Sequence, residues 1–121
     1  MQIHDIHHVQ ITVAPDQVEA ARQFYCGVLG LPEIEKPDSL KGRGGFWILA
    51  GSRQVHIGIE EGVNRHATKA HIAYQVNDLA AWHQHLTAHG ISIGDSVPIS
   101  GFDRFEFRDP FGNRIEFIQP R

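Results

Sequence analysis

The sequence has a single cysteine, no long hydrophobic run and no cluster of basic residues, and each absence excludes a class of protein. Cys26 cannot form an internal disulfide, which fits a reducing cytoplasm. The apolar runs are far too short to span a bilayer, and the first residues lack the basic and apolar regions of a signal peptide. The formal net charge of −3, without a basic stripe, argues against a nucleic-acid partner. We therefore expect a cytoplasmic protein that binds neither membranes nor nucleic acids.

Histidine, in contrast, is abundant. The chain has 121 residues, enough for one domain with one core, and nine of them are histidines. Histidine is the commonest metal ligand and a natural acid or base near neutral pH. Cys26 lies in a helical pattern beside Phe24 and Tyr25, so we interpret it as a packing residue rather than a catalytic thiol. The histidines are therefore the first candidates for a functional site.

Two segments of the chain are repeated further on. Residues 8–13 (HVQITV) resemble residues 71–76 (HIAYQV) at an offset of 63, and residues 54–57 (QVHI) resemble residues 114–117 (RIEF) at an offset of 60. Each half of the chain therefore begins and ends with a strand that carries a potential metal ligand. These residues are His8 and His56 in the first half, and His71 and Glu116 in the second. If the two copies pack about a pseudo-twofold axis, the four side chains converge on one point.

Alternation and turn signals predict the elements of the first half. After a strand at 6–13, a helix is expected with Asp16 as its N-cap, Glu19 completing a capping box, and Gly30 at its end. The remaining elements are a short strand at 31–35, a loop at 36–45, and strands at 46–50 and 53–59 joined by a tight turn. The glycine-rich loop lacks a phosphate-binding fingerprint, so we interpret it as flexible or, alternatively, as a lid over the site.

The second half repeats the same order of elements. After a connector at 61–68, a strand is expected at 69–76 and a helix capped by Asn77 or Asp78 and ending at Gly90. A weak strand at 91–93 and a hairpin of strands 102–107 and 113–118 complete the half. Because neither half has enough core alone, we expect one domain over residues 1–121, with modules at about 1–62 and 66–121.

Strand parity places the four candidate ligands on equivalent faces. Side chains alternate between the two faces of a strand, so His8 lies opposite Val9, and His71 lies opposite Ile72. The same rule places His56 and Glu116 opposite the apolar residues that flank them. Three imidazoles and a carboxylate form a suitable site for one divalent metal ion such as zinc, nickel, iron or manganese. Taken one at a time, each residue is better explained as a partly buried polar group that is hydrogen-bonded to its neighbours; the matched set favours a metal site.

The same residues carry a family resemblance over essentially the whole chain. His7–Val13, Ala70–Ala73 and Phe107–Glu116, with its Asp-Pro-x-Gly-Asn-x-x-Glu motif, resemble the vicinal oxygen chelate superfamily. That superfamily includes glyoxalase I, fosfomycin-resistance thiol transferases, bleomycin-resistance proteins and extradiol dioxygenases. The resemblance implies an α+β fold of two βαβββ modules, which form a U-shaped mixed sheet around a metal site. It also implies a substrate that chelates the metal through adjacent oxygens.

Carried over to this chain, the family's metal-ligand positions fall on His8, His71 and Glu116, with a fourth position on His56. Glyoxalase I resembles this layout but has a glutamate at the fourth position, so His56 departs from it. Extradiol dioxygenases and fosfomycin-resistance enzymes use two histidines and one glutamate. In that arrangement His56 is a fourth ligand or a general base. Bleomycin-resistance binders lack the metal set, so its presence argues against simple sequestration.

Other polar residues receive less specific interpretations. We expect Gln10, Thr12, Trp47 and Phe107 to line the substrate pocket. Arg108 is interpreted as a surface residue, and the role of Arg104 stays open. His7 faces the helix side by parity and is interpreted as structural or partly exposed, and three further histidines are placed on the solvated face of the second helix, His83, His85 and His89.

The sequence therefore predicts a metal-dependent enzyme that acts on a small oxygen-rich substrate. Its reaction is a glyoxalase-like lyase or isomerase step, a thiol transfer or a dioxygenation, with Glu116 and His56 as the catalytic proton carriers. By the resemblance, the chain is expected to form a homodimer. The alternative function is a non-catalytic protein that binds or sequesters a small molecule, as bleomycin-resistance proteins do.

Overall fold

The computed structural model describes all residues, 1–121, as two compact units. Unit 1 comprises Met1–Val63 and unit 2 comprises Asn64–Arg121. Each unit runs strand, helix, strand, strand, strand, and each forms one four-stranded mixed sheet. The expected α+β class with two βαβββ modules is therefore confirmed. The expectation that both modules form a single domain stays a prediction.

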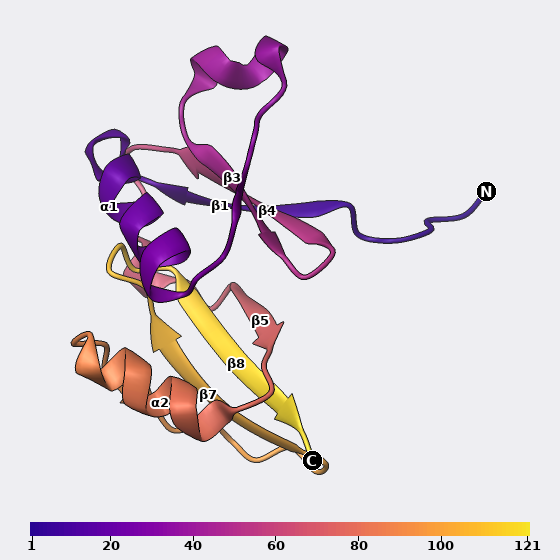
Figure 1. Cartoon of the computed structure of the whole chain (residues 1–121), viewed down its shortest axis with the longest axis vertical. Coiled ribbons are helices and arrows are strands. Elements are labelled where there is room, and N and C mark those ends of the chain that lie inside the picture. The colour runs from indigo at the N-terminus through magenta and orange to yellow at the C-terminus, as the bar shows by residue number, and fades with distance from the viewer. The chain divides into compact units, whose positions relative to one another are not determined.

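The sheet of unit 1 has the order β1-β4-β3-β2 (Figure 1). Its strands are β1 (His8–Val13), β2 (Glu33–Ile34), β3 (Phe46–Ala50) and β4 (Arg53–Ile59). β1 runs parallel to β4, whereas β3 runs antiparallel to both of its neighbours. Alternation sets the two faces of this sheet: Val13, Ile48, Val55 and Ile57 are buried, together with Phe24 and Tyr25 of the helix.

The helical segment of unit 1 begins differently from the prediction. A 3₁₀ turn η1 (Pro15–Gln17) leads into α1 (Val18–Arg22) and then into a π-helical stretch η2 (Gln23–Val28). Gln17 Oε1 accepts a hydrogen bond from the Ala14 amide at 3.0 Å, and Glu19 pairs with Arg22. The predicted capping box of Asp16 and Glu19 was therefore wrong, because the N-cap is Ala14, two residues earlier, and the turn starts at Pro15, whose fixed φ suits the first helical position.

The predicted loop 36–45 contains regular structure. A 3₁₀ helix, η3 (Asp38–Arg43), occupies most of it, and Lys36 Nζ donates to the Gly44 carbonyl at 2.5 Å. The segment ends at Gly45, whose φ is +75°. A Cβ atom there would lie 2.1 Å from the Ile57 carbonyl oxygen, so only glycine allows β3 to start this close to β4.

Unit 2 repeats the topology with the order β5-β8-β7-β6. After a 3₁₀ turn η4 (Arg65–Ala67), its elements are β5 (His71–Gln75), α2 (Leu79–Ala88), β6 (Ile93–Gly94), β7 (Phe102–Arg108) and β8 (Arg114–Pro120). Of the two predicted caps, Asp78 is the one used: its Oδ1 accepts from the Ala81 amide at 3.0 Å. In Figure 1, α2 lies along β7 and β8, where Trp82 packs edge-on against Phe117.

The turn between β7 and β8 is held by the side chain of one aspartate. Asp109 is 3% exposed, and its Oδ1 accepts hydrogen bonds from the amides of Phe111 at 3.0 Å and Asn113 at 2.8 Å. Gly112 closes the turn with a φ of +106°. The Asp-Pro-Phe-Gly-Asn motif therefore forms a tight loop that sets where β8 begins.

The apolar side of each sheet forms the core of its unit. In unit 2, Phe105, Phe107, Ile115 and Phe117 are buried on this side. The opposite side, here called the polar face, carries His8 and His56 in unit 1 and His71 and Glu116 in unit 2, as parity predicts. None of the helices has the length and hydropathy needed to cross a membrane.

Candidate metal centre

The four candidate ligands occupy equivalent positions in the two sheets. In unit 1, His8 pairs with Gln54 and Gln10 pairs with His56 in the β1–β4 ladder. In unit 2, His71 pairs with Arg114 and Ala73 pairs with Glu116 in the β5–β8 ladder. In each unit the candidate on the first strand is therefore the diagonal neighbour of the candidate on the last strand, on one face of a parallel pair. The two halves of the repeat thus place one pair of candidate ligands each.

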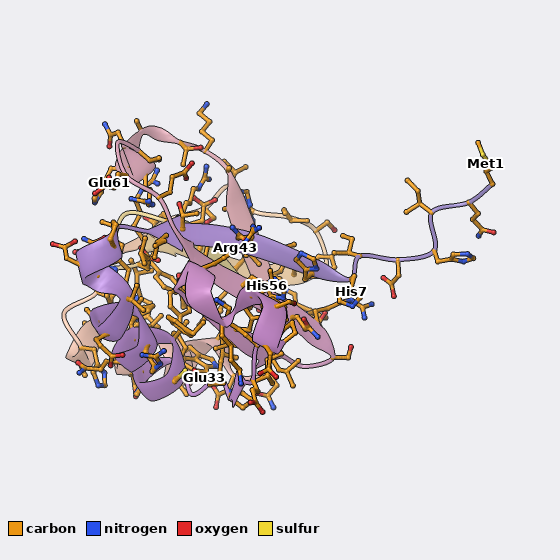
Figure 2. All side chains as sticks on the ribbon, turned by 90° about the horizontal axis from the view of Figure 1, so that it is seen from above. Met1, His7, Glu33, Arg43, His56 and Glu61 are labelled. Carbon is orange, nitrogen blue, oxygen red and sulfur yellow. The ribbon has the colours of Figure 1, made fainter.

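The first histidine of each pair has its Nδ1 atom engaged locally. His8 Nδ1 lies 3.0 Å from His7 Nδ1, and His71 Nδ1 donates to the carbonyl of Lys69 at 3.0 Å. A histidine ligand commonly uses one ring nitrogen for the metal while the other is fixed by such a partner. In both units the arrangement leaves Nε2 as the atom suited to a metal ion. Figure 2 shows His7 where the N-terminal segment joins β1, so it lies beside the site.

His56 is packed between two aromatic rings. Its ring stacks on Trp47 with centroids 3.7 Å apart and on His8 with centroids 4.0 Å apart. His56 Nε2 lies 2.9 Å from Gln54 Oε1, so the amide oxygen of Gln54 fixes Nε2 as the protonated nitrogen. Burial, with the nearby charges of His8, His7 and Lys36, lowers the pKa of His56 to about 4. His56 is therefore neutral at pH 7 and a weak base.

Glu116 is held among charged residues. It is 6% exposed, and its Oε1 lies 3.5 Å from His71 Nε2 and 2.9 Å from Arg104 Nη1. Arg104 and Glu106 share the polar face because Phe105 and Phe107, between and beside them, are in the core. The role of Arg104, left open by the sequence, is thus a direct contact with the candidate carboxylate ligand.

Glu106 was not among the residues predicted for the site. It pairs directly with Glu116 across β7 and β8, and its carboxylate binds Arg114 Nη2 at 2.6 Å. Burial raises the pKa of Glu106, but the hydrogen bond from Arg114 and the charges of Arg114, Arg104 and His71 together hold this pKa below its ordinary value. The signal that identifies Glu106 is its ladder position opposite Glu116, which depends on the strand register.

The four residues predicted to contact substrate lie in different environments. Trp47 lies over His56, and Gln10 is the ladder partner of His56, so both belong to the polar face of unit 1. Thr12 is further along β1, where its hydroxyl donates to Glu60 Oε1 at 3.0 Å. The ring of Phe107 is 3% exposed and packs edge-on against Phe117 in the core of unit 2.

Arg108 is not the surface residue that the sequence suggested. Its guanidinium donates to the carbonyls of Arg65 at 3.0 Å, Gly112 at 2.9 Å and Thr68 at 3.0 Å. These acceptors belong to the segment before β5 and to the β7–β8 turn, which sequence alone does not bring together. Arg108 therefore anchors the two segments that lead into β5 and β8, the strands that carry His71 and Glu116.

Unit 2 has an open cleft of about 640 Å³, which neither His71 nor Glu116 lines. It is lined by residues 90–94, by the end of β7 and its turn at 106–110, and by Arg114. Arg114 is the ladder partner of His71, so the cleft lies next to the candidate ligands of unit 2.

Cys26 is in unit 1, and burial with the charge of Glu33 raises the pKa of its thiol, which agrees with a packing role.

The donor chemistry of the two pairs fits a divalent metal, but neither pair suffices alone. No group of three or more histidine, cysteine or acidic side chains gathers within reach of one metal ion. A protein site for zinc or a similar ion needs about three or four protein ligands. Neither pair by itself therefore supplies enough ligands for such a site.

Sequence comparison supports the family suggested by these features. Residues 5–117 match the family model of the Glyoxalase/Bleomycin resistance protein/Dioxygenase superfamily. The chain belongs to this superfamily. No curated protein matches the chain significantly. A glyoxalase family protein from Bacillus anthracis is similar in structure, with 40% sequence identity and a TM-score of 0.91 over 100% of this chain and 98% of that one.

Solved structures with lower sequence identity share the fold. The fosfomycin resistance protein FosX from Listeria monocytogenes is 16% identical, with a TM-score of 0.80 over 99% of this chain and 96% of FosX. A FosX variant was crystallised with Mn(II) and 1S,2S-dihydroxypropylphosphonic acid; it is 18% identical, with a TM-score of 0.75 over 96% of this chain and 90% of that one. An integron cassette protein from Vibrio cholerae is 22% identical, with a TM-score of 0.74 over 98% of this chain and 97% of that one.

Proposed function

We propose that this superfamily member is a metal-dependent enzyme whose small substrate chelates the metal through adjacent oxygens. The observation that carries the proposal is the matched placement of the two pairs, in which His8 and His71 each have Nδ1 engaged, which leaves Nε2 as the atom for a metal ion. A stability role alone gives no reason for two histidines to stand at equivalent register positions, each with Nδ1 engaged by a residue one or two positions earlier in the chain.

The ligand set that we propose is His8, His71 and Glu116. His56 is the fourth candidate, but its Nε2 is bonded to Gln54 and its ring is stacked between Trp47 and His8. We assign it to positioning the ring of His8, or to a fourth ligand through Nδ1 after a small rotation. The two pairs come from one chain or from the two chains of a homodimer.

The chain's own residues define the remaining chemistry. A bound divalent ion acts as a Lewis acid on the substrate oxygens. Glu116 is the group best suited to accept or return a proton beside that ion, because its carboxylate lies on the polar face next to His71. His56 is a poor base at neutral pH because its pKa is about 4. The polar face of unit 1, with Gln10 and Trp47, then contacts the substrate.

The reaction class follows from proton handling and metal identity. Glyoxalase-like isomerisation with two proton-carrying carboxylates is less well supported, because the fourth position is His56 and not a glutamate. A thiol addition or an oxygenation requires one proton carrier at most, which the set of two histidines and Glu116 supplies. A manganese complex of FosX, a member of this superfamily, favours manganese as the first ion to test.

Metal analysis of the purified protein, beside a His71→Ala variant, tests the proposal. We expect near-stoichiometric metal in the wild-type chain after reconstitution and loss of that metal in the variant. Iron would direct the search toward oxygenation, nickel or zinc toward isomerisation, and manganese toward thiol transfer. A wild-type chain that holds no more metal than His71→Ala would refute the proposal.

A non-catalytic small-molecule binder is the second candidate. It is favoured by the contact between Arg104 and Glu116, because a guanidinium satisfies the buried carboxylate without any metal. The two candidates differ in one measurement. A binder retains affinity for its ligand in Glu116→Ala and His8→Ala variants, whereas the enzyme loses both metal and activity.

A further inference from the structure

Arg104 contacts the candidate ligand Glu116 and a distant backbone carbonyl with one guanidinium. Its Nη1 lies 2.9 Å from Glu116 Oε1, and the two side chains are 13% and 7% exposed. Its Nε and Nη2 donate to the carbonyl of Val97 at 3.0 Å and 2.5 Å. A planar guanidinium with both edges engaged has little freedom to rotate. The position of Arg104 is therefore set by the β6–β7 connector, independently of Glu116.

The same guanidinium reaches a second carboxylate. Arg104 Nη1 lies 3.5 Å from Glu106 Oε1, and Glu106 is held in turn by Arg114. One oxygen of Glu116, Oε1, thus contacts both this fixed donor at 2.9 Å and His71 Nε2 at 3.5 Å. Rotation of the Glu116 carboxylate away from His71 would break a charge-assisted hydrogen bond in a mostly buried place.

Unit 1 has no counterpart of this arginine. Phe46 pairs with Ile57 as Phe105 pairs with Phe117, so the residue equivalent to Arg104 is Gly45. The contact is therefore not a by-product of the repeated fold. It exists only beside the anionic member of the ligand set.

We infer that Arg104 is a positioning residue of the metal centre: it holds the Glu116 carboxylate toward His71 and thereby strengthens metal binding. The inference rests on the proposed function, and Arg104 acts through Glu116 without touching metal or substrate. The opposite effect, a weakening of metal binding by Arg104, also has a physical basis, because a cation beside a ligand carboxylate repels a metal ion. The sign of the change in affinity decides between orientation and repulsion.

Two substitutions and a matched control test the inference. Arg104→Met removes the guanidinium, and Arg104→Lys keeps the charge without the fork that joins Val97 to Glu116. The control is Arg121→Met, which removes an exposed arginine paired with Asp103 at 2.9 Å in the same unit. The Zn²⁺ dissociation constant is measured by competition with a chromophoric chelator, and the value for His71→Ala defines binding outside the site.

We expect both Arg104 variants to bind Zn²⁺ about tenfold or more weakly, as substitution of partners that orient metal ligands commonly does. Arg121→Met should bind Zn²⁺ as the wild type does. The visible absorption spectrum of the Co²⁺-loaded proteins is the second readout: a changed ligand geometry shifts it in both Arg104 variants, whereas a purely structural role leaves it unchanged. If Arg104→Met does not fold, as judged by circular dichroism, Arg104→Lys carries the test.

Three results overturn the inference. Arg104→Met binding as tightly as the wild type, or more tightly, would show that Arg104 only competes with the metal. Wild-type affinity in Arg104→Lys would show that charge alone is sufficient. A wild-type protein that binds Zn²⁺ no more tightly than His71→Ala would refute the metal centre itself. Only this comparison tests the proposed function; the two Arg104 results test the positioning role.

Discussion

The two units place their candidate ligands at the same ladder positions but surround them with opposite kinds of chemistry. In unit 1, His56 is stacked between Trp47 and His8, an aromatic environment. In unit 2, Glu116 lies among Arg104, Glu106 and Arg114, an ionic one. The duplicated fold therefore sets where the ligands lie, and the neighbours on β3 and β7 decide what each ligand can do.

The largest expected effect comes from replacing Glu116 and His56, the candidate ligands on the last strands of the two units, with glutamine. Glu116→Gln removes the only anionic ligand of the proposed set and should weaken metal binding by more than about 100-fold. If His56 positions His8, His56→Gln should weaken it by about tenfold, because the ring that stacks on His8 is lost. Chelator competition with both variants measures the difference. Equal losses would show that the units contribute ligands of equal weight.

Mixing variants of the two units asks whether the site is built within one chain. His8→Ala and His71→Ala are each expected to bind no metal. If sites form across two chains, refolding an equal mixture restores about a quarter of the wild-type sites, because half of the dimers are mixed and each has one intact site. Metal per chain after refolding is the measurement. No restoration in dimers shown to be mixed would place all ligands within one chain.

Acid should destabilise the protein through His56. Its pKa is about 4 in the folded state and 6.5 in the unfolded chain, so the unfolded chain takes up the proton first as pH falls. Stability is therefore lost between about pH 6.5 and 4, by about 2 kcal/mol after allowance for screening, and no further below that range. Urea unfolding of the metal-free wild type and of His56→Gln at several pH values measures this loss, which should be absent in the variant. Parallel pH curves would contradict it.

The smallest expected effect concerns the helices of the two units. Asp78 caps α2 through the Ala81 amide, whereas no side chain caps α1. Asp78→Ala should cost about 1 kcal/mol of unfolding free energy. Asp16→Ala, the matched change at the predicted cap of unit 1, should cost close to nothing. Chemical denaturation measures both values. A similar loss in Asp16→Ala would restore the capping box that the structure replaces with the Gln17–Ala14 contact.

Several features follow from local sequence and were predicted correctly. The strands β3 and β4, a helix cap at Asn77 or Asp78, and the faces of His8 and His71 depend on alternation and turn chemistry within a few residues. The helix start at Pro15 was missed because Asp16 and Glu19 match the capping-box pattern in the sequence. In the structure it is the side chain of Gln17 that accepts the hydrogen bond, from the Ala14 amide. The 3₁₀ helix at Asp38–Arg43 was missed because glycine-rich composition indicates loops and does not identify short helical turns.

The chain by itself determined the repeat, the two βαβββ units and the face on which each candidate ligand lies, because strand parity needs only nearest neighbours in sequence. The tertiary structure alone decided the partners of those ligands: Trp47 over His56, Arg104 and Glu106 beside Glu116, and Arg108 on the carbonyls before β5. These contacts join residues of different strands. They depend on strand register and side-chain reach, which no local pattern encodes.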